Sequence, residues 1–195
     1  MYYIVGLGNP GEKYAHTRHN VGWQVLDEVC RVQGLPALVV DKHVSGRVTE
    51  GMIGGKPVHV LYPDTFMNNS GVAVAKFVPR NEVTNLIVIH DEIDLPFGDI
   101  KIVKSRGDGG NNGIKSLIDK LGSKDFIRIR IGIAPRSFWT GEVKRPKGGG
   151  PLERFVLKPF TKKEVEQLEE ITTRVTAALE TILKEGVESA MNKFN

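Results

Sequence analysis

The residues best suited to chemistry in this chain are one histidine and one aspartate that lie far apart in the sequence. His19 follows a glycine-rich loop, and Asp91 follows the aliphatic run 86–89. An unperturbed imidazole titrates near neutral pH, so His19 can accept a proton at pH 7. A carboxylate beside an imidazole orients the ring and stabilises its protonated form. The two residues therefore predict general-base chemistry if the fold brings them together.

Three asparagines, Asn9, Asn68 and Asn112, stand in predicted loops. Carboxamides donate and accept hydrogen bonds without titrating, which suits them to positioning a carbonyl, an attacking water or a developing oxyanion. Asn9 and Asn112 also fit ordinary turns, because asparagine tolerates left-handed backbone. With His19 and Asp91, these side chains are the parts of a hydrolase that uses water directly. The sequence leaves open which asparagine contacts the oxyanion.

The other reactive side chains give weaker evidence for a nucleophile or a metal site. Cys30 lies on the apolar stripe of a predicted helix, and no serine stands in a nucleophile-elbow motif. The acidic cluster Asp91-Glu92-Asp94 lacks a companion histidine for metal binding, so we expect no metal. His90 should point to the opposite strand face from Asp91 and pack against neighbours.

The loop at 6–11, Gly-Leu-Gly-Asn-Pro-Gly, also matches the dinucleotide-binding pattern G-x-G-x-x-G. That pattern binds a cofactor where the loop opens directly into a helix and an acidic residue ends the next strand. Here Pro10-Gly11 prolongs the turn, and Asp27 and Glu28 fall on the following helix. We therefore expect neither a nicotinamide nor a flavin, and no other cofactor.

The composition is that of an ordinary globular protein. The chain has 195 residues, 40% hydrophobic and 26% charged, which suits one domain over residues 1–195. Its single cysteine excludes an intramolecular disulfide, and no signal peptide or membrane-spanning run is evident, so we expect a cytoplasmic protein. A net charge of +4 and a pI near 9.1 permit a polyanionic partner.

Strands and helices interleave along the chain. We expect strands near 2–7, 44–52, 58–62, 85–90, 99–104 and 126–133, and helices near 17–33, 70–77 and 114–121. A long C-terminal helix should begin at Thr161, which forms a capping box with Glu164. Its apolar stripe is Val165, Leu168, Ile171, Val175, Leu179 and Ile182. The predicted class is α/β: a single domain with a mixed, twisted β-sheet covered by helices on both faces.

Five short motifs follow one another in the first two thirds of the chain. They are 6–11 with Tyr14, Thr17-Arg18-His19-Asn20, Thr65-Phe66-Met67-Asn68, His90-Asp91-Glu92-Ile93-Asp94, and Gly109-Gly110-Asn111-Asn112-Gly113. With the strand at 126–133, this set resembles the bacterial-type peptidyl-tRNA hydrolases. The resemblance implies a metal-independent esterase that cleaves peptide from the 3′ end of tRNA, recycling stalled peptidyl-tRNA in translation.

The resemblance also implies a role for each residue at a motif position. His19 would be the general base for water, and Asp91 would hold and polarise it. Asn9 would contact the peptide backbone, and Asn112 would position the water or the 3′-terminal nucleotide. Tyr14, Phe66, Met67 and Asn68 would line the substrate cleft. The alternative is a non-catalytic RNA-binding relative of the splicing-factor kind. The presence of His19, Asp91 and the three asparagines argues against this alternative.

Basic residues on elements adjoining 109–113 predict a phosphate track for the tRNA acceptor stem, with salt-sensitive affinity that is largely independent of sequence. Asp99 and Asp108 interrupt this track, and ordinary solvated charge is the competing interpretation. The track residues are Lys101, Lys104, Arg106, Lys115, Lys120, Arg128 and Arg130.

Three stretches depart from the family pattern. Asn111 stands where the family usually has histidine, and 105–108 is bulkier and more charged than the usual glycine-rich run. The basic Pro/Gly loop at 134–151 is longer than expected, and we interpret it as an insertion. With Trp139 it would serve as an additional RNA contact or a mobile lid. A monomer is the default expectation.

Overall fold

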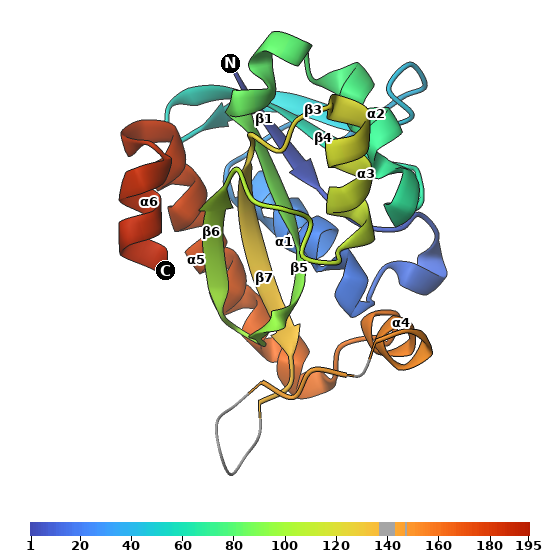
Figure 1. Ribbon diagram of the computed structural model, residues 1–195. Coiled ribbons are helices and arrows are strands. Elements are labelled where there is room, and N and C mark those ends of the chain that lie inside the picture. The colour runs from blue at the N-terminus through green and yellow to red at the C-terminus, as the bar shows by residue number, and fades with distance from the viewer. Residues whose placement is uncertain (137–142, 147) are drawn as a thin grey trace.

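A computed structural model of the chain, which describes residues 1–136, 143–146 and 148–195, is built on a seven-stranded sheet (Figure 1). The strand order is β2-β3-β4-β1-β5-β7-β6. The central strands β4, β1, β5 and β7 run parallel, while β2, β3 and β6 join the edges antiparallel. Their bounds are β1 Tyr2–Gly6, β2 Val39–Asp41, β3 Gly46–Ile53, β4 Lys56–Pro63, β5 Leu86–Pro96, β6 Ile100–Lys104 and β7 Ile127–Ala134.

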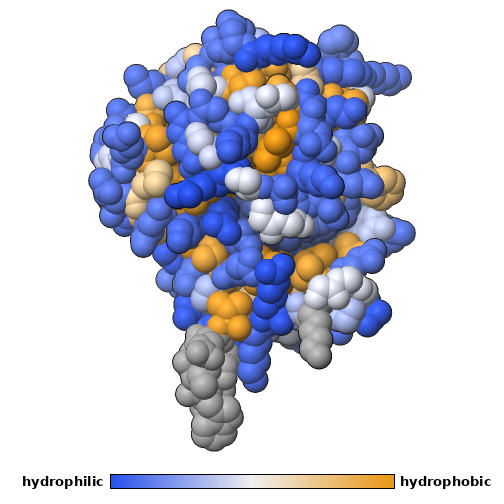
Figure 2. Space-filling model, in the orientation of Figure 1, coloured by the Kyte–Doolittle hydropathy of each residue, from blue (hydrophilic) through white to orange (hydrophobic). Residues whose placement is uncertain are grey.

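Helices cover both faces of this sheet, so the predicted α/β fold is confirmed (Figure 1). One face carries α1 (Val21–Val32), α5 (Lys162–Glu185) and α6 (Val187–Phe194), and the other carries α2 (Ser70–Phe77) and α3 (Asn112–Leu121). The short α4 (Gly150–Val156) lies apart from both layers, beyond the carboxyl ends of the strands. The face shown in Figure 2 is largely hydrophilic. The short 3₁₀ turns are η1 Glu12–Tyr14, η2 Arg18–Asn20, η3 Met67–Asn69 and η4 Arg80–Asn85.

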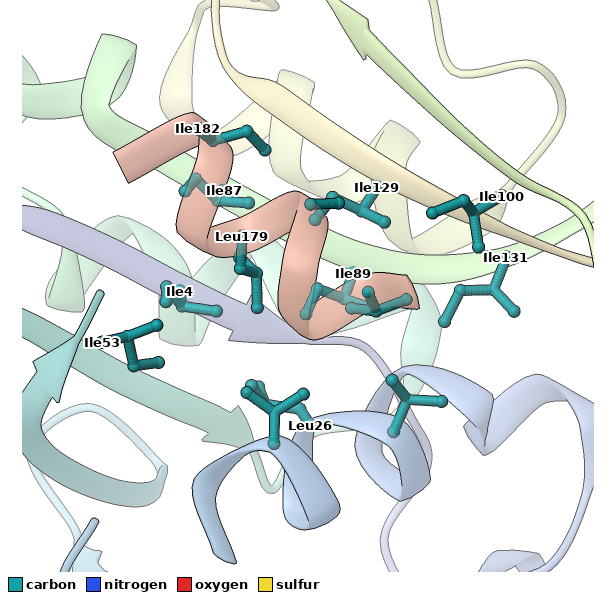
Figure 3. Packing of buried hydrophobic residues seen from close by; sticks show 14 of the residues in the cluster. Ile4, Leu26, Ile53, Ile87, Ile89, Ile100, Ile129, Ile131, Leu179 and Ile182 are labelled. Carbon is teal, nitrogen blue, oxygen red and sulfur yellow. The ribbon is translucent and has the colours of Figure 1, made fainter. Parts of the chain in front are cut away.

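The larger core lies between the sheet and the helices α1 and α5. Ile87 and Ile89 of β5 pack there against Leu26 of α1 and Leu179 of α5 (Figure 3). Leu86 and Val88, which alternate with these residues along β5, face the second core under α2 and α3. This strand is therefore buried on both sides. A continuous aliphatic run is typical of such a central parallel strand.

The first turn of α1 lies directly on the backbone of Leu7, just after β1, and of Ile89, within β5. A Cβ atom added at Gly22 would lie 2.4 Å from the Ile89 carbonyl oxygen and 2.6 Å from that of Leu7. Only glycine permits this approach without a shift of the backbone. Because η2 immediately precedes α1, the contact at Gly22 holds the His19 turn against β5.

Several predicted boundaries are wrong. The first helix does not begin at Thr17, because residues 18–20 form the separate turn η2. The strand predicted to end at His90 continues to Pro96, since Asp91 and Glu92 pair with β7 before the register shifts. Asp91 is therefore a residue of β5 and does not follow it.

The predicted long C-terminal helix is confirmed as α5, and a second short helix, α6, follows it. Gly186, at φ +96°, ends α5 and starts α6. The capping box of Thr161 and Glu164 is confirmed, but Val165 of the predicted apolar stripe is 52% exposed. Neither β2 nor α4 was predicted from the sequence. Across the described ranges, no helix is long and apolar enough to cross a membrane.

Candidate active site

A pocket of about 630 Å³ lies at the carboxyl ends of the central strands. Its walls come from the loop after β1, the η2 and η3 turns, the end of β5, the start of α3, and α4. Figure 2 shows hydrophobic surface where α4 meets the body of the molecule. The polar lining residues are Asn9, Tyr14, His19, Asn68, Asp91, Glu92, Asn111, Asn112, Arg145 and Glu153.

His19 and Asp91, separated by 72 residues in the chain, meet in this pocket. The Nδ1 atom of His19 lies 2.8 Å from Oδ2 of Asp91. A carboxylate oxygen accepts hydrogen bonds, so Nδ1 donates and the Nε2 atom is left with its lone pair. The two side chains are 13% and 4% exposed, which shields their interaction from solvent.

Asp91 sets the proton affinity of His19. Burial disfavours the imidazolium and is the largest single influence, but the charge of Asp91 and its hydrogen bond together outweigh burial. The pKa of His19 is therefore raised above its ordinary value of 6.5. A base with such a pKa is a stronger proton acceptor than a free imidazole.

The neighbouring histidine has a different environment. His90 is fully buried on the other face of β5, where burial lowers its pKa to about 4 and keeps it neutral. Its Nδ1–H donates to the Asp91 carbonyl oxygen at 2.7 Å. His90 thus helps to fix the backbone of Asp91 and, as predicted, packs away from it.

The second oxygen of the Asp91 carboxylate contacts the residue that departs from the family pattern. The Nδ2 atom of Asn111 donates to Oδ1 of Asp91 at 2.9 Å. The Oδ1 atom of Asn111 accepts from the backbone N–H groups of Gly113 and Ile114, and so caps α3.

Asn9 is held by three hydrogen bonds. The side chain of Asn20 accepts from the Asn9 backbone N–H and donates to its carbonyl oxygen, each at 2.9 Å. The Oδ1 atom of Asn9 accepts from the Met67 backbone N–H at 2.7 Å. The carboxamide orientation is therefore fixed, and its Nδ2 end is the one available to a ligand in the pocket.

The remaining predicted cleft residues also line the pocket, with different exposure. Met67 is buried, whereas Phe66 is 55% exposed and meets the ring of Tyr14 edge-on. Asn68 and Asn112 are exposed. The structure therefore brings together all eight residues predicted to be catalytic or substrate-binding, with buried polar groups at one end and an aromatic pair at the mouth.

The predicted phosphate track does not form one row of exposed charges. Arg128 is only 3% exposed, and its guanidinium donates to the Gly107 carbonyl oxygen. Arg130 donates to the buried Glu92 at 2.7 Å. Strand alternation places Lys104 with Ile102, on the sheet face opposite Lys101. Lys101, Arg106, Lys115 and Lys120 remain exposed.

Sequence reasoning missed the wall formed by α4. Leu152 and Val156 line the pocket, and Arg145, before this helix, forms an ion pair with Asp94 at 2.7 Å. Pro151 in the first turn, followed by apolar residues at helical spacing, is the signal that would have found α4. Residues 137–142, which include Trp139, and Lys147 lie outside the described residues, and the interpretation of 134–151 as an insertion stays a prediction.

This arrangement can take a proton from water at His19 and stabilise the resulting charge through Asp91. Neutral amides beside it can orient a carbonyl. In the described part of the chain, no three His, Cys, Asp or Glu side chains gather as metal ligands. Cys30 is buried in the core under α1 and faces away from this chemistry.

Comparison of the chain with known proteins shows the family to which it belongs. A family model described as peptidyl-tRNA hydrolase matches residues 3–195. The chain belongs to the peptidyl-tRNA hydrolase family. A peptidyl-tRNA hydrolase from Thermodesulfovibrio yellowstonii is 42% identical over 199 residues, covering 100% of this chain and 99% of the relative. One from Syntrophotalea carbinolica is 40% identical, with coverage of 100% and 97%.

The fold comparison agrees. A crystal structure of peptidyl-tRNA hydrolase from Acinetobacter baumannii has a TM-score of 0.87 and 30% identity, covering 100% of this chain and 94% of the other. The motif resemblance ended near residue 133, whereas the family match extends through α4, α5 and α6. In this peptidyl-tRNA hydrolase family member, the C-terminal helices are thus part of the shared fold.

Proposed function

We propose that this chain hydrolyses the ester bond between peptide and tRNA in peptidyl-tRNA, with His19 as general base. The observation that carries the proposal is the 2.8 Å hydrogen bond between His19 and Asp91 inside the pocket, in a chain of the peptidyl-tRNA hydrolase family. A volume of about 630 Å³ suits a terminal nucleotide and the first residue of a peptide.

In the first step a water molecule attacks the ester carbonyl carbon while Nε2 of His19 takes one of its protons. Asp91 stabilises the imidazolium through Nδ1. The tetrahedral intermediate then collapses, and the bond from the carbonyl carbon to the ribose oxygen breaks. The imidazolium returns its proton to that oxygen, which leaves free tRNA and a peptide carboxylic acid.

The asparagines position the reacting groups. Asn9 presents its Nδ2–H to a peptide carbonyl, because its own oxygen is occupied by the Met67 amide. Asn68 and Asn112 are exposed in the pocket and supply neutral donors for the ester carbonyl, the attacking water or the terminal nucleotide. Tyr14 and Phe66 offer aromatic faces at the mouth, against which a side chain or a base can pack.

The tRNA acceptor stem would follow the exposed basic residues near α3. Lys101, Arg106 and Lys115 meet the requirement for exposed charge, whereas Arg128 does not. Backbone contacts of this kind give affinity that falls with salt and carries little sequence preference. We further propose that the enzyme acts as a monomer without metal.

The test is hydrolysis of an N-blocked aminoacyl-tRNA in the presence of EDTA, with His19→Ala compared with His43→Ala. His43 is exposed in the turn before β3, so it is a matched histidine control. We expect activity in the wild type and in the control, and a loss of kcat of at least about a hundredfold in His19→Ala. Binding of tRNA without hydrolysis by the wild type would favour the non-catalytic RNA-binding alternative.

A further inference from the structure

The side chain of Asn111 joins the Asp91 carboxylate to the first turn of α3. Its oxygen accepts from the backbone N–H groups of Gly113 and Ile114 at 3.0 and 3.1 Å. Its Nδ2 group donates to the Asp91 carboxylate at 2.9 Å and approaches the Asp91 carbonyl oxygen at 3.3 Å. One carboxamide therefore uses both ends, and each end has partners of a single hydrogen-bonding type.

These contacts leave the Asn111 carboxamide no freedom to flip. Backbone N–H groups only donate, so the oxygen must face α3 and the NH₂ group must face Asp91. Oδ1 of Asp91 thus receives a donor from Asn111, and Oδ2 is directed to His19. Asp91 is only 4% exposed, so water does not readily replace either partner.

We propose that Asn111 is a positioning residue that orients the side chain at position 91 towards His19. The donor of Asn111 holds Oδ1 of Asp91, so Oδ2 is the oxygen that meets His19. If position 91 carries a carboxamide, the same donor decides which end of that carboxamide faces His19. With aspartate there, His19 keeps its proton on Nδ1 and its lone pair on Nε2. The inference rests on the proposed function for its catalytic consequence, but the tautomer itself is a property of the free protein.

The same side chain couples two parts of the site. Asn112, in the first turn of α3, lines the same pocket as His19, and Asn111 connects this turn to Asp91. A shift of α3 would move Asn112 and the Asp91 carboxylate together. Asn111 thereby keeps the relative positions of His19 and the Asn112 side chain constant.

A pair of substitutions tests the orientation directly. In Asp91→Asn, the new carboxamide must turn its oxygen to the NH₂ group of Asn111, so its own NH₂ group faces His19. The imidazole then accepts at Nδ1, carries its proton on Nε2 and cannot act as base. In the double variant Asp91→Asn with Asn111→Asp, residue 111 becomes an acceptor. The carboxamide at 91 then reverses, and the proton of His19 returns to Nδ1.

The expected readouts are the ¹⁵N chemical shifts of His19 in the free protein and kcat. We expect Asp91→Asn to place the proton on Nε2 and to lower kcat by about a thousandfold or more. The double variant should restore the Nδ1–H tautomer and recover at least about tenfold in kcat. A tautomer unchanged in Asp91→Asn, or left on Nε2 in the double variant, would overturn the inference.

A milder variant keeps the test valid if the double variant does not fold. Asn111→Ser preserves a capping oxygen for α3 but is too short to reach Asp91. We expect about tenfold lower kcat with KM and Tm near the wild type. The exposed Asn81→Ser, in η4, is the matched control and should leave kcat unchanged. Unaltered kcat in Asn111→Ser would contradict the proposal. A wild type without hydrolysis would refute the proposed function, whereas the tautomer measurement would still decide this inference.

Discussion

Arg18, the residue before the proposed base, should contribute more to stability than any exposed ion pair. It is 6% exposed, and one of its terminal nitrogens donates to both carboxylate oxygens of Glu164 at 3.0 and 2.7 Å. The other terminal nitrogen donates to the carbonyl oxygens of Lys158 and Pro159 at 3.3 and 2.7 Å. Its guanidinium also stacks on a phenylalanine ring at 4.8 Å. One side chain thus connects η2 to the segment between α4 and α5 and to the first turn of α5.

The expected cost of Arg18→Met follows from these contacts. Removing one partner of a buried ion pair typically costs about 3–5 kcal/mol, because the other charge is left uncompensated. Glu164 is 20% exposed and keeps its capping contacts with Thr161, so about 2 kcal/mol is the better figure for this term. The two carbonyl groups that lose their donor add about 1 kcal/mol together. We therefore expect about 3 kcal/mol and a fall in Tm of about 6–12 °C.

The assay is thermal and urea unfolding at pH 7, with Arg31→Met as the control. Arg31 pairs with Glu28 on the exposed face of α1, so its loss should leave Tm nearly unchanged. If Arg18→Met unfolds within about 0.5 kcal/mol of the wild type, the buried network does not contribute as argued. Equal losses in both variants would equally refute the distinction between buried and exposed pairs.

The pH dependence gives a second check on the same network. Burial alone would raise the pKa of Glu164, but hydrogen bonds from Thr161 and from Arg18 outweigh it and lower that pKa below 4.5. A lowered folded-state pKa contributes stability that is present above 4.5 and lost as pH falls through the folded-state value. The stability difference between the wild type and Arg18→Met should therefore narrow in acid. A stability difference that stays constant down to the pH of acid unfolding would contradict this account.

Three further outcomes are expected. Because Asp91 raises the pKa of His19 above 6.5 and the base must be neutral, kcat/KM should fall on the acid side with a midpoint above pH 6.5; a midpoint at or below 6.5 would contradict the ion pair. Burial raises the pKa of Cys30 to about 11, so a thiol reagent at pH 8 should label Cys30 only after unfolding, and rapid labelling of the native protein would refute its burial. Phe66→Ala should raise KM several-fold with little change in kcat, because Phe66 lies at the mouth of the pocket; a loss confined to kcat would place it at the reacting atoms instead.

The elements that the sequence predicted best are those whose environment is uniform along their length. The run 86–89 is aliphatic because β5 is buried on both faces, and α1 shows an apolar stripe because one side packs on the sheet. The continuation of β5 through Asp91 to Pro96 was missed, since polar residues there remain in the sheet only through pairing with β7. That pairing joins segments about forty residues apart, and no local pattern reveals it.

The site likewise contains residues that the sequence predicted and contacts that it did not. Motif order pointed to His19 and Asp91, and the fold joins them, but residue types alone did not reveal how Asp91 is held. The contact from Asn111 depends on an N-cap at α3 and on the position of β5 at once. Arg128 shows the reverse failure. The predicted phosphate track needs an exposed arginine there, whereas Arg128 is buried and donates to the Gly107 carbonyl oxygen.

The site has one rigid end and one open end, and this division fits the proposed substrate. Asp91, which holds the proposed base, and Asn9, assigned to the peptide backbone, are 4% and 7% exposed and are each held by several hydrogen bonds, so each has one orientation. Phe66, at the mouth, is 55% exposed. The bond to be broken is the same in every peptidyl-tRNA, while the peptide side chains vary. An enzyme for such substrates needs fixed geometry only at the ester and the peptide backbone beside it. If instead the mouth selected particular peptides, Phe66→Ala would change KM unequally among N-blocked aminoacyl-tRNAs that differ in their side chain.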